Sequence, residues 1–191
     1  MLAIGGTVRT FGLNTLSGSS KNPPEKRISA NADPEGSRDE FRIKGAFLFK
    51  FIKYTRWPTE HLPEGAPIQV VLAGPQPHLA EIESLLEGRK IRGHTIYVKR
   101  VKKAKDVRAP TVLFCAGLKP EEEAQLLESF GRKPILFVGN EEGSAVRGAT
   151  MGFYSSDGKV RFAVNKQSAK KSKLKISSEL LKLAKIVGMP Q

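Results

Sequence analysis

Three short apolar runs constrain the fold of this chain more than any other feature. They lie at residues 68–72, 111–116 and 135–138, and the first is bounded by the turn residues Pro67 and Gly74. A strand in a parallel sheet has this continuous apolar character, because helices cover both of its faces. The sequence therefore predicts buried strands in a mostly parallel sheet.

Segments with helical periodicity separate these runs. Pro77 suits the first turn of one helix, and Pro120 introduces a second helix over residues 120–130. Residues 95–101 alternate less regularly but favour a further strand. Strands that alternate with helices imply parallel pairing with right-handed crossovers. The apolar residues of the first of these helices are Leu79, Ile82, Leu85 and Leu86.

A longer amphipathic segment precedes the first strand. Ser37 and Glu40 have the spacing of a capping box, in which the hydroxyl and the carboxylate bind free N–H groups of the first helical turn. Apolar residues then recur at three- and four-residue spacing until Pro58 ends the element. This pattern predicts a core helix over about residues 38–56. Its predicted apolar stripe consists of Ile43, Phe47, Phe51 and Tyr54.

The last third of the chain changes character. Residues 151–155 and 159–164 flank a turn at Asp157 and Gly158, which predicts an antiparallel hairpin. Ser177 or Ser178 then caps a predicted terminal helix. The apolar side of that helix would consist of Leu180, Leu181, Leu183, Ala184 and Val187. All elements together predict an α/β layered sandwich with a mostly parallel central sheet, a C-terminal antiparallel hairpin and helices on both faces.

The chain of 191 residues has room for one ordinary domain, which we expect over residues 38–188. Residues 1–36 have no sustained apolar period, so we expect a disordered tail or the remnant of an export leader there. The first residues lack the basic lead-in of a signal peptide. No run approaches the roughly 18 apolar residues of a membrane-spanning helix, and we expect no transmembrane segment.

The net charge of +13 is concentrated in two stretches. Residues 99–108 carry a net charge of +5 and residues 159–185 carry +8, and the two together equal the net charge of the chain. Localised positive charge attracts nucleic acid, anionic lipid or an acidic protein partner. The lysine-rich residues 166–175 contain no aromatic side chain on which single-stranded nucleic acid could stack, so nucleic acid is the less favoured partner.

The sequence has no recognisable catalytic or cofactor motif. It contains neither of the common glycine-rich phosphate loops, and its three histidines stand apart from any serine or cysteine motif that they could activate. The single Cys115 can form neither an internal disulfide nor a zinc site with other cysteines. We therefore expect a protein that is not an enzyme and has no catalytic, cofactor-binding or metal-binding residues. A small enzyme is the third hypothesis.

Two long passages near the ends of the predicted domain have a distinctive form. The first is EFRIKGAFLFKFIKYTRWP at residues 40–58, and the second combines GKVRFAVN at 158–165 with LKISSELLKLA at 174–184. In order and spacing these passages resemble the YfiR-like family of small envelope regulators, and the resemblance covers about residues 40–188.

This resemblance implies an α/β sandwich without catalytic residues that is usually exported to the periplasm and is often a homodimer. The best-known members of the family repress a membrane-bound diguanylate cyclase. We therefore expect a non-enzymatic envelope regulator that binds a membrane-anchored signalling partner, a diguanylate cyclase or a sensor kinase, and so controls cyclic-di-GMP output. Well-known members carry disulfide-forming cysteines, whereas Cys115 is alone, so disulfide-based sensing is not expected here. The alternative is a cytoplasmic basic nucleic-acid-binding protein.

The predicted partner surface combines the lysine-rich stretch with the apolar end of the chain. Apolar residues beside concentrated positive charge can dock on another protein. The candidate partner-binding residues are Lys170, Lys171, Lys173, Ile186, Val187 and Met189.

Overall fold

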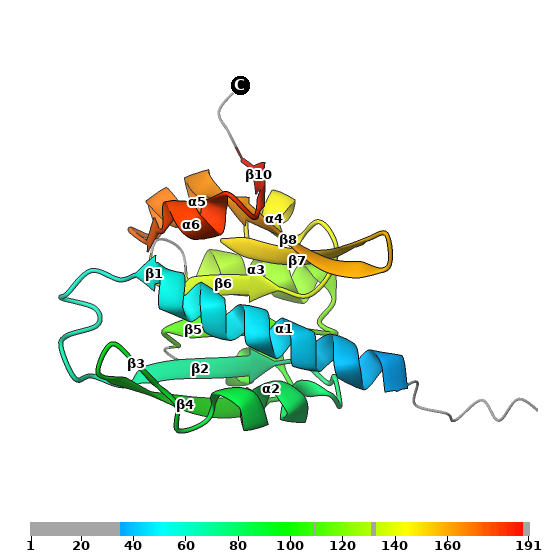
Figure 1. Cartoon of the computed structure of the whole chain (residues 1–191), viewed down its shortest axis with the longest axis horizontal. Coiled ribbons are helices and arrows are strands. Elements are labelled where there is room, and N and C mark those ends of the chain that lie inside the picture. The colour runs from blue at the N-terminus through cyan, green and yellow to red at the C-terminus, as the bar shows by residue number, and fades with distance from the viewer. Residues whose placement is uncertain (1–34, 109, 131–132, 189–191) are drawn as a thin grey trace, which may run out of the picture. The chain divides into compact units, whose positions relative to one another are not determined.

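The computed structural model describes residues 35–108, 110–130 and 133–188 (Figure 1). The helices are α1 (Glu35–Tyr54), α2 (Leu79–Leu86), the short 3-10 helix η1 (Ala104–Asp106), α3 (Pro120–Phe130), α4 (Ser144–Arg147), α5 (Lys166–Lys171) and α6 (Ser178–Leu181). The strands are β1 (Thr55–Arg56), β2 (Ile68–Ala73), β3 (Lys90–Ile91), β4 (His94–Val101), β5 (Val112–Cys115), β6 (Leu136–Gly139), β7 (Met151–Ser156), β8 (Lys159–Asn165), β9 (Lys175–Ile176) and β10 (Lys185–Val187).

Eight of these strands form one sheet in the order β10-β8-β7-β6-β5-β2-β4-β3. Pairing is parallel from β4 through β2, β5 and β6 to β7, and also between β10 and β8. The β7–β8 hairpin and the short β3–β4 pair are antiparallel. The predicted mostly parallel sheet with a C-terminal antiparallel hairpin is therefore confirmed.

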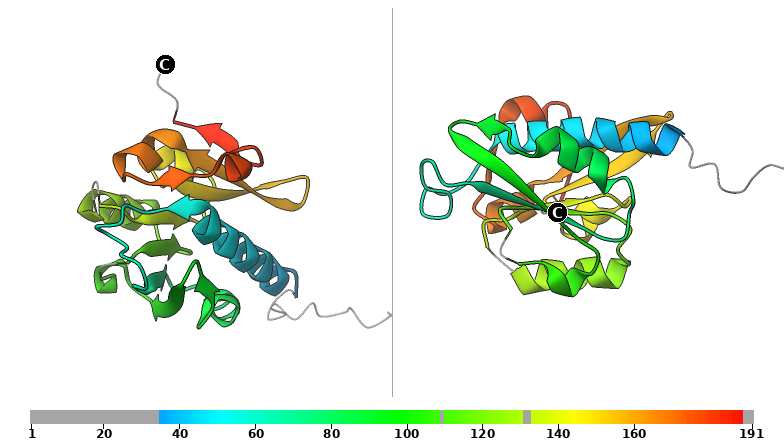
Figure 2. Two further views of the ribbon diagram at one scale, coloured as in Figure 1. Left: turned by 60° about the vertical axis from the view of Figure 1, so that its left-hand side comes forward. Right: turned by 90° about the horizontal axis from the view of Figure 1, so that it is seen from below.

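Helices cover both faces of this sheet, as predicted. Figure 2 shows α1 and α2 over one face and α3 over the other. Neighbouring side chains of a strand point to opposite faces, so Phe114 packs in the core under α1 while Leu113 packs in the core under α3. The rings of Phe51 and Phe153 stack at 5.5 Å in the first core.

The helix α1 differs from its prediction at its start and in its buried face. It begins at Glu35, so Ser37 lies inside the first turn and the predicted capping box was wrong. Ile43 was predicted to be buried but is 48% exposed. Of the other predicted residues, Phe51 is buried, and Phe47 and Tyr54 are partly buried against the core. The buried residues of α1 are Phe41, Lys44, Gly45, Leu48, Phe51 and Ile52.

The predicted hairpin is present, with strands at Met151–Ser156 and Lys159–Asn165. Asp157 and Gly158 both have positive φ, of 52° and 67°, as a two-residue turn between twisted strands requires. Phe162 and Val164 are buried. This hairpin continues the sheet beyond β6.

The predicted terminal helix was largely wrong. Ser177 does cap α6 by accepting a hydrogen bond from the Glu179 N–H, but α6 ends at Leu181. Leu183 was assigned to the apolar side of a helix and is instead 72% exposed. The chain then forms β10, parallel to β8, because the β-branched Ile186 and Val187 suit an extended strand at the sheet edge.

Several short elements were not predicted. These include α4, α5, and the small antiparallel pair of β1 with β9. Of the expected tail at residues 1–36, residues 1–34 lie outside the described part of the chain, whereas residues 35 and 36 belong to α1. The expected boundary of the domain at residue 38 therefore falls inside a helix.

Candidate functional site

A basic pocket lies where β1 and β9 meet the turn between β3 and β4. Its cavity volume is about 530 Å³. Its cations are Lys53, Arg56, Arg92 and Lys175, and its hydroxyl groups come from Tyr54, Ser177 and Ser178. The apolar Ile176 and the acidic Glu179 complete the lining.

The β1–β9 pair brings two of these cations together from distant parts of the sequence. Arg56 lies opposite Lys175 in the antiparallel register, and both side chains are exposed. The N–H of Ser177 donates to the carbonyl of Tyr54 at 2.9 Å and extends the pairing by one step. The end of α1 and the segment after α5 are thereby joined.

Arg92 reaches the pocket from a strained turn. It has a φ of 51° and is followed by Gly93 with a φ of 84°, so both residues of this turn are left-handed. A left-handed conformation is uncommon for a residue with a side chain, and glycine or asparagine is preferred at such a position. The guanidinium of Arg92 donates to the carbonyl oxygen of Thr55 at 2.6 Å, which holds it against β1.

The charges of the basic pocket are not neutralised within the described part of the chain. None of its four cations forms an ion pair among the residues that the structure places. Burial, and after it the positive charge of Arg56, lower the pKa of Arg92. A carboxylate or phosphate bound there would relieve this repulsion and accept charge-assisted hydrogen bonds.

The three lysines of the predicted partner surface follow one another along α5 and the segment after it. Lys170 and Lys171 form the last turn of α5, and Lys173 follows with a φ of 54°. Lys171 lines a small cavity of about 180 Å³ together with Phe130 of α3. Lys173 lies two residues before Lys175 of the basic pocket. The lysines therefore lead along the surface from α3 toward that pocket.

The apolar part of the predicted surface lies on another element. Ile186 and Val187 are half-buried on β10, at the edge of the large sheet, and Met189 lies outside the described residues. The ammonium of Lys185 stands 5.7 Å from the centre of the Tyr154 ring. That the lysines and these apolar residues bind one partner stays a prediction.

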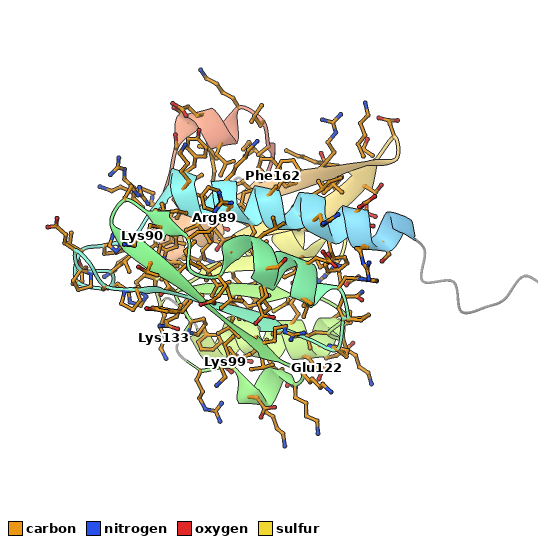
Figure 3. The ribbon with its side chains drawn as sticks, turned by 60° about the horizontal axis from the view of Figure 1, so that its bottom comes forward. Arg89, Lys90, Lys99, Glu122, Lys133 and Phe162 are labelled. Carbon is orange, nitrogen blue, oxygen red and sulfur yellow. The ribbon has the colours of Figure 1, made fainter. Side chains whose placement is uncertain are left out.

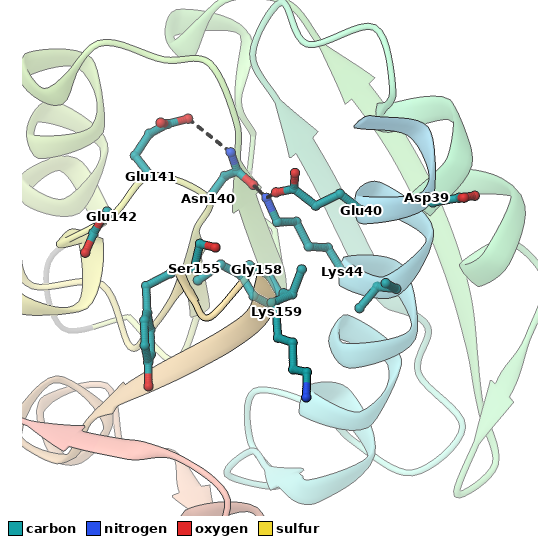
Figure 4. A pocket seen from close by; sticks show the side chains of 13 residues that line it. Asp39, Glu40, Lys44, Asn140, Glu141, Glu142, Ser155, Gly158 and Lys159 are labelled. Carbon is teal, nitrogen blue, oxygen red and sulfur yellow. Dashed lines mark hydrogen bonds and ion pairs between the residues drawn. The ribbon is translucent and has the colours of Figure 1, made fainter. Parts of the chain in front are cut away.

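A second cavity, of about 600 Å³, lies between α1, the end of β6 and the β7–β8 hairpin (Figure 4). Four carboxylates and two lysines line it. Lys44, only 5% exposed, forms an ion pair with Glu40 and donates to the Asn140 side-chain oxygen at 2.7 Å. Asn140 in turn donates to the Glu141 carboxylate at 3.1 Å. These bonds join α1 to the end of β6, so we assign Lys44 a structural role.

No group of three or more His, Cys, Asp or Glu in residues 35–108, 110–130 and 133–188 is arranged to hold a metal ion. Among the helices that the structure describes, none combines the length and the apolar character of a membrane span. Cys115 is 3% exposed and packs in the core under α3.

The cations Lys53, Arg56 and Arg92 were missed by the sequence analysis. Lys53 and Arg56 lie among other basic residues in the passage at 40–58, and no local pattern marks either of them or Arg92 as part of a site. Gly93 after Arg92 was the only local indication of a tight turn. The pocket arises from long-range pairing, which periodicity does not reveal.

The described residues form a layered α/β fold that carries a basic pocket. The chain belongs to the YfiR/HmsC-like family, because the sequence model of that family matches residues 41–185. The resemblance found in the sequence is thereby confirmed. This family consists of periplasmic regulators of cyclic-di-GMP signalling, and is regulatory rather than catalytic.

Among solved structures, the chain is similar to a conserved domain protein from Vibrio cholerae O1 biovar El Tor strain N16961. The two are 14% identical with a TM-score of 0.45, and the match covers 76% of this chain and 59% of the other. The chain thus spans less than two thirds of that protein. No curated protein matches the sequence significantly.

Proposed function

We propose that this chain is a non-enzymatic regulator of the cell envelope that binds a membrane-anchored signalling protein and thereby controls cyclic-di-GMP output. Family membership supports the general class. The partner is a diguanylate cyclase or a sensor kinase. The regulator acts by contact and not by chemistry on a substrate.

The basic pocket is the observation that carries the proposed contact. Its cations have no carboxylate partners in the described part of the chain, and the hydroxyls of Ser177 and Ser178 add hydrogen-bond donors. An acidic side chain of the partner would complete these interactions. Lys173 and Lys175 connect the pocket to the lysines of α5, so the basic pocket and the predicted partner lysines form one proposed surface.

The double variant Arg56→Glu/Lys175→Glu tests this proposal. Both side chains are exposed and face each other in the β1–β9 pair, so their reversal leaves the core intact. In the native bacterium, deletion of the gene should raise cyclic-di-GMP, and the wild-type gene should restore the original level. The double variant should fail to restore it.

The matched control is Lys119→Glu/Lys159→Glu. It makes the same change in charge at two exposed positions outside both the basic pocket and the small cavity that Lys171 lines. This control should restore the cyclic-di-GMP level as the wild type does. Equal restoration by both double variants would contradict the role of the pocket, and unchanged cyclic-di-GMP on deletion would contradict the proposed function.

The net charge of +13 favours nucleic-acid binding as the second candidate. Phosphate contacts release counterions, so binding to DNA or RNA weakens steeply as salt rises. Fluorescence anisotropy with a labelled DNA duplex over a range of salt concentrations measures this slope. Tight binding with a steep slope would favour the second candidate over the regulator.

A further inference from the structure

The two basic stretches of the sequence lie at opposite edges of the eight-stranded sheet. Residues 99–108 begin in β4. In the described sheet, the two-residue strand β3 is all that lies between β4 and this edge. Residues 159–185 begin in β8 and end in β10 at the other edge. Figure 1 shows β4 and β10 at opposite ends of the sheet. The positive charge is therefore divided between two separate surfaces.

We call residues 97–108 the β4–η1 basic edge. Asp106 is its single acidic residue. Within the described chain, Arg100 is the one cation of this edge that forms an ion pair, with Glu83 at 2.7 Å. The exposed cations of the β4–η1 basic edge are Lys99, Arg100, Lys102, Lys103, Lys105 and Arg108.

The loop that carries these cations is held in place. The Arg108 guanidinium donates to the carbonyl oxygens of Lys105 at 2.6 Å and of Val107 at 2.9 Å. Val107 is 5% exposed and packs in the core under α3. The loop therefore presents its lysines from a fixed backbone, which lowers the entropy that binding would cost.

An exposed aromatic ring accompanies the charge. Tyr97 is 49% exposed, and it lies two residues before Lys99 on the same face of β4. Figure 3 shows Lys99 on the same side of the sheet as Lys133 and Glu122. Tyrosine beside lysine is typical of surfaces at the boundary of a lipid bilayer, because the ring is apolar and the hydroxyl is wet.

Protection of a sheet edge explains only part of this pattern. Lysines on an edge strand prevent pairing with other chains, and Lys99 fits that role. The strand ends at Val101, however, and four further cations follow it where no strand edge needs protection. These cations call for an anionic partner.

We propose that the β4–η1 basic edge binds the anionic headgroups of a lipid bilayer. A bilayer offers many anions over a broad surface, which suits cations spread along a strand and a loop. Single-stranded nucleic acid would need several aromatic rings for stacking, and Tyr97 is the one aromatic residue in 94–108. The β8–β10 edge then points away from the bilayer and stays accessible to a protein. The inference does not depend on the proposed function, since it uses other residues.

Sedimentation of the full chain with vesicles tests the inference. The vesicles contain phosphatidylcholine with about 40 mol % phosphatidylglycerol, in about 0.1 M salt. Each lysine near an anionic surface increases binding about fivefold, so removal of three should lower it at least about 100-fold. The triple variant Lys99→Glu/Lys103→Glu/Lys105→Glu should show this loss, and pure phosphatidylcholine vesicles should bind neither protein.

The matched control is Lys170→Glu/Lys171→Glu/Lys173→Glu, which changes the charge equally in the other basic stretch. It should reduce binding less than about fivefold. An equal loss in both triple variants would overturn the inference, because net charge alone would then explain binding. So would wild-type binding by the Lys99 triple variant while its circular dichroism is native. Tighter binding of a DNA duplex than of anionic vesicles in the same salt would overturn it in favour of nucleic acid.

Discussion

Substitutions at the buried Lys44 and at Glu40 should have strongly non-additive effects on the free energy of unfolding. The Lys44 side chain is 6% exposed and that of Glu40 is 46% exposed. Water can therefore solvate the Glu40 carboxylate, whereas the Lys44 ammonium needs its protein partners to compensate for lost solvation. Removing one partner of a buried ion pair costs about 3–5 kcal/mol, because an uncompensated charge remains. Water reaches Glu40, and Asn140 still accepts from Lys44, so Glu40→Gln should lower the free energy of unfolding by about 2 kcal/mol.

Replacing Lys44 itself should cost less. The ammonium lies 5.0 Å from the centre of the Phe41 ring and 5.8 Å from that of Phe153, so a methionine of similar length would meet an apolar environment. Glu40 is exposed enough to be hydrated, and Asn140 loses one hydrogen bond. Lys44→Met should therefore cost about 1 kcal/mol. Once Lys44 is gone, adding Glu40→Gln should cost almost nothing, which gives a coupling energy of about 2 kcal/mol.

Urea denaturation provides the measurement. Trp57 is the single tryptophan and is 9% exposed, so its fluorescence reports unfolding of the core. The exposed Lys50 lies on the same helix, and Lys50→Met should change stability by no more than about 0.5 kcal/mol. Additive costs of the two substitutions, or a larger cost for Lys44→Met than for Glu40→Gln, would refute the reasoning.

Two further predictions concern the backbone and the thiol. Gly74→Ala should cost at least about 3 kcal/mol in urea denaturation, since Gly74 has a φ of 126° and an added Cβ would lie 1.9 Å from the Ala116 carbonyl oxygen. Gly158→Ala, at a φ of 67° with nothing within 4 Å, should cost only about 1 kcal/mol; equal costs would contradict the steric argument. Burial, and after it the charge of Glu123, raise the pKa of Cys115 well above its ordinary value. Alkylation of Cys115 at about pH 8 should be at least about 100-fold slower in the native protein than in urea, and comparable rates would show that the thiol is accessible.

The parallel core was predictable because burial on both faces leaves an unbroken apolar run. Val112 to Cys115 are all buried, as are Leu136 to Gly139, and no polar residue interrupts either strand. The end of the chain was not predictable in this way. Ile186 and Val187 are too few to distinguish a strand from the last turn of a helix, and their pairing with β8 decides the outcome.

The candidate site was harder to predict than the fold. Arg56 and Lys175 become neighbours only through the β1–β9 pair, and Arg92 joins them through a turn that arginine seldom occupies. Lys44 illustrates the same limit, since its spacing from Glu40 resembles an ordinary surface ion pair on a helix. The contact with Asn140, from the end of β6, is what makes the pair internal.

The arrangement of the cations bears more on function than their number. Exposed lysines in general keep a protein soluble at little cost, because water surrounds each charge. In the basic pocket, by contrast, burial and the neighbouring charge of Arg56 lower the pKa of Arg92. Solubility does not require such an arrangement. A bound anion would reduce the repulsion and accept charge-assisted hydrogen bonds. Cations that converge from β1, β9 and the turn after β3 therefore favour the basic pocket over the general positive charge as the place where an acidic partner is recognised.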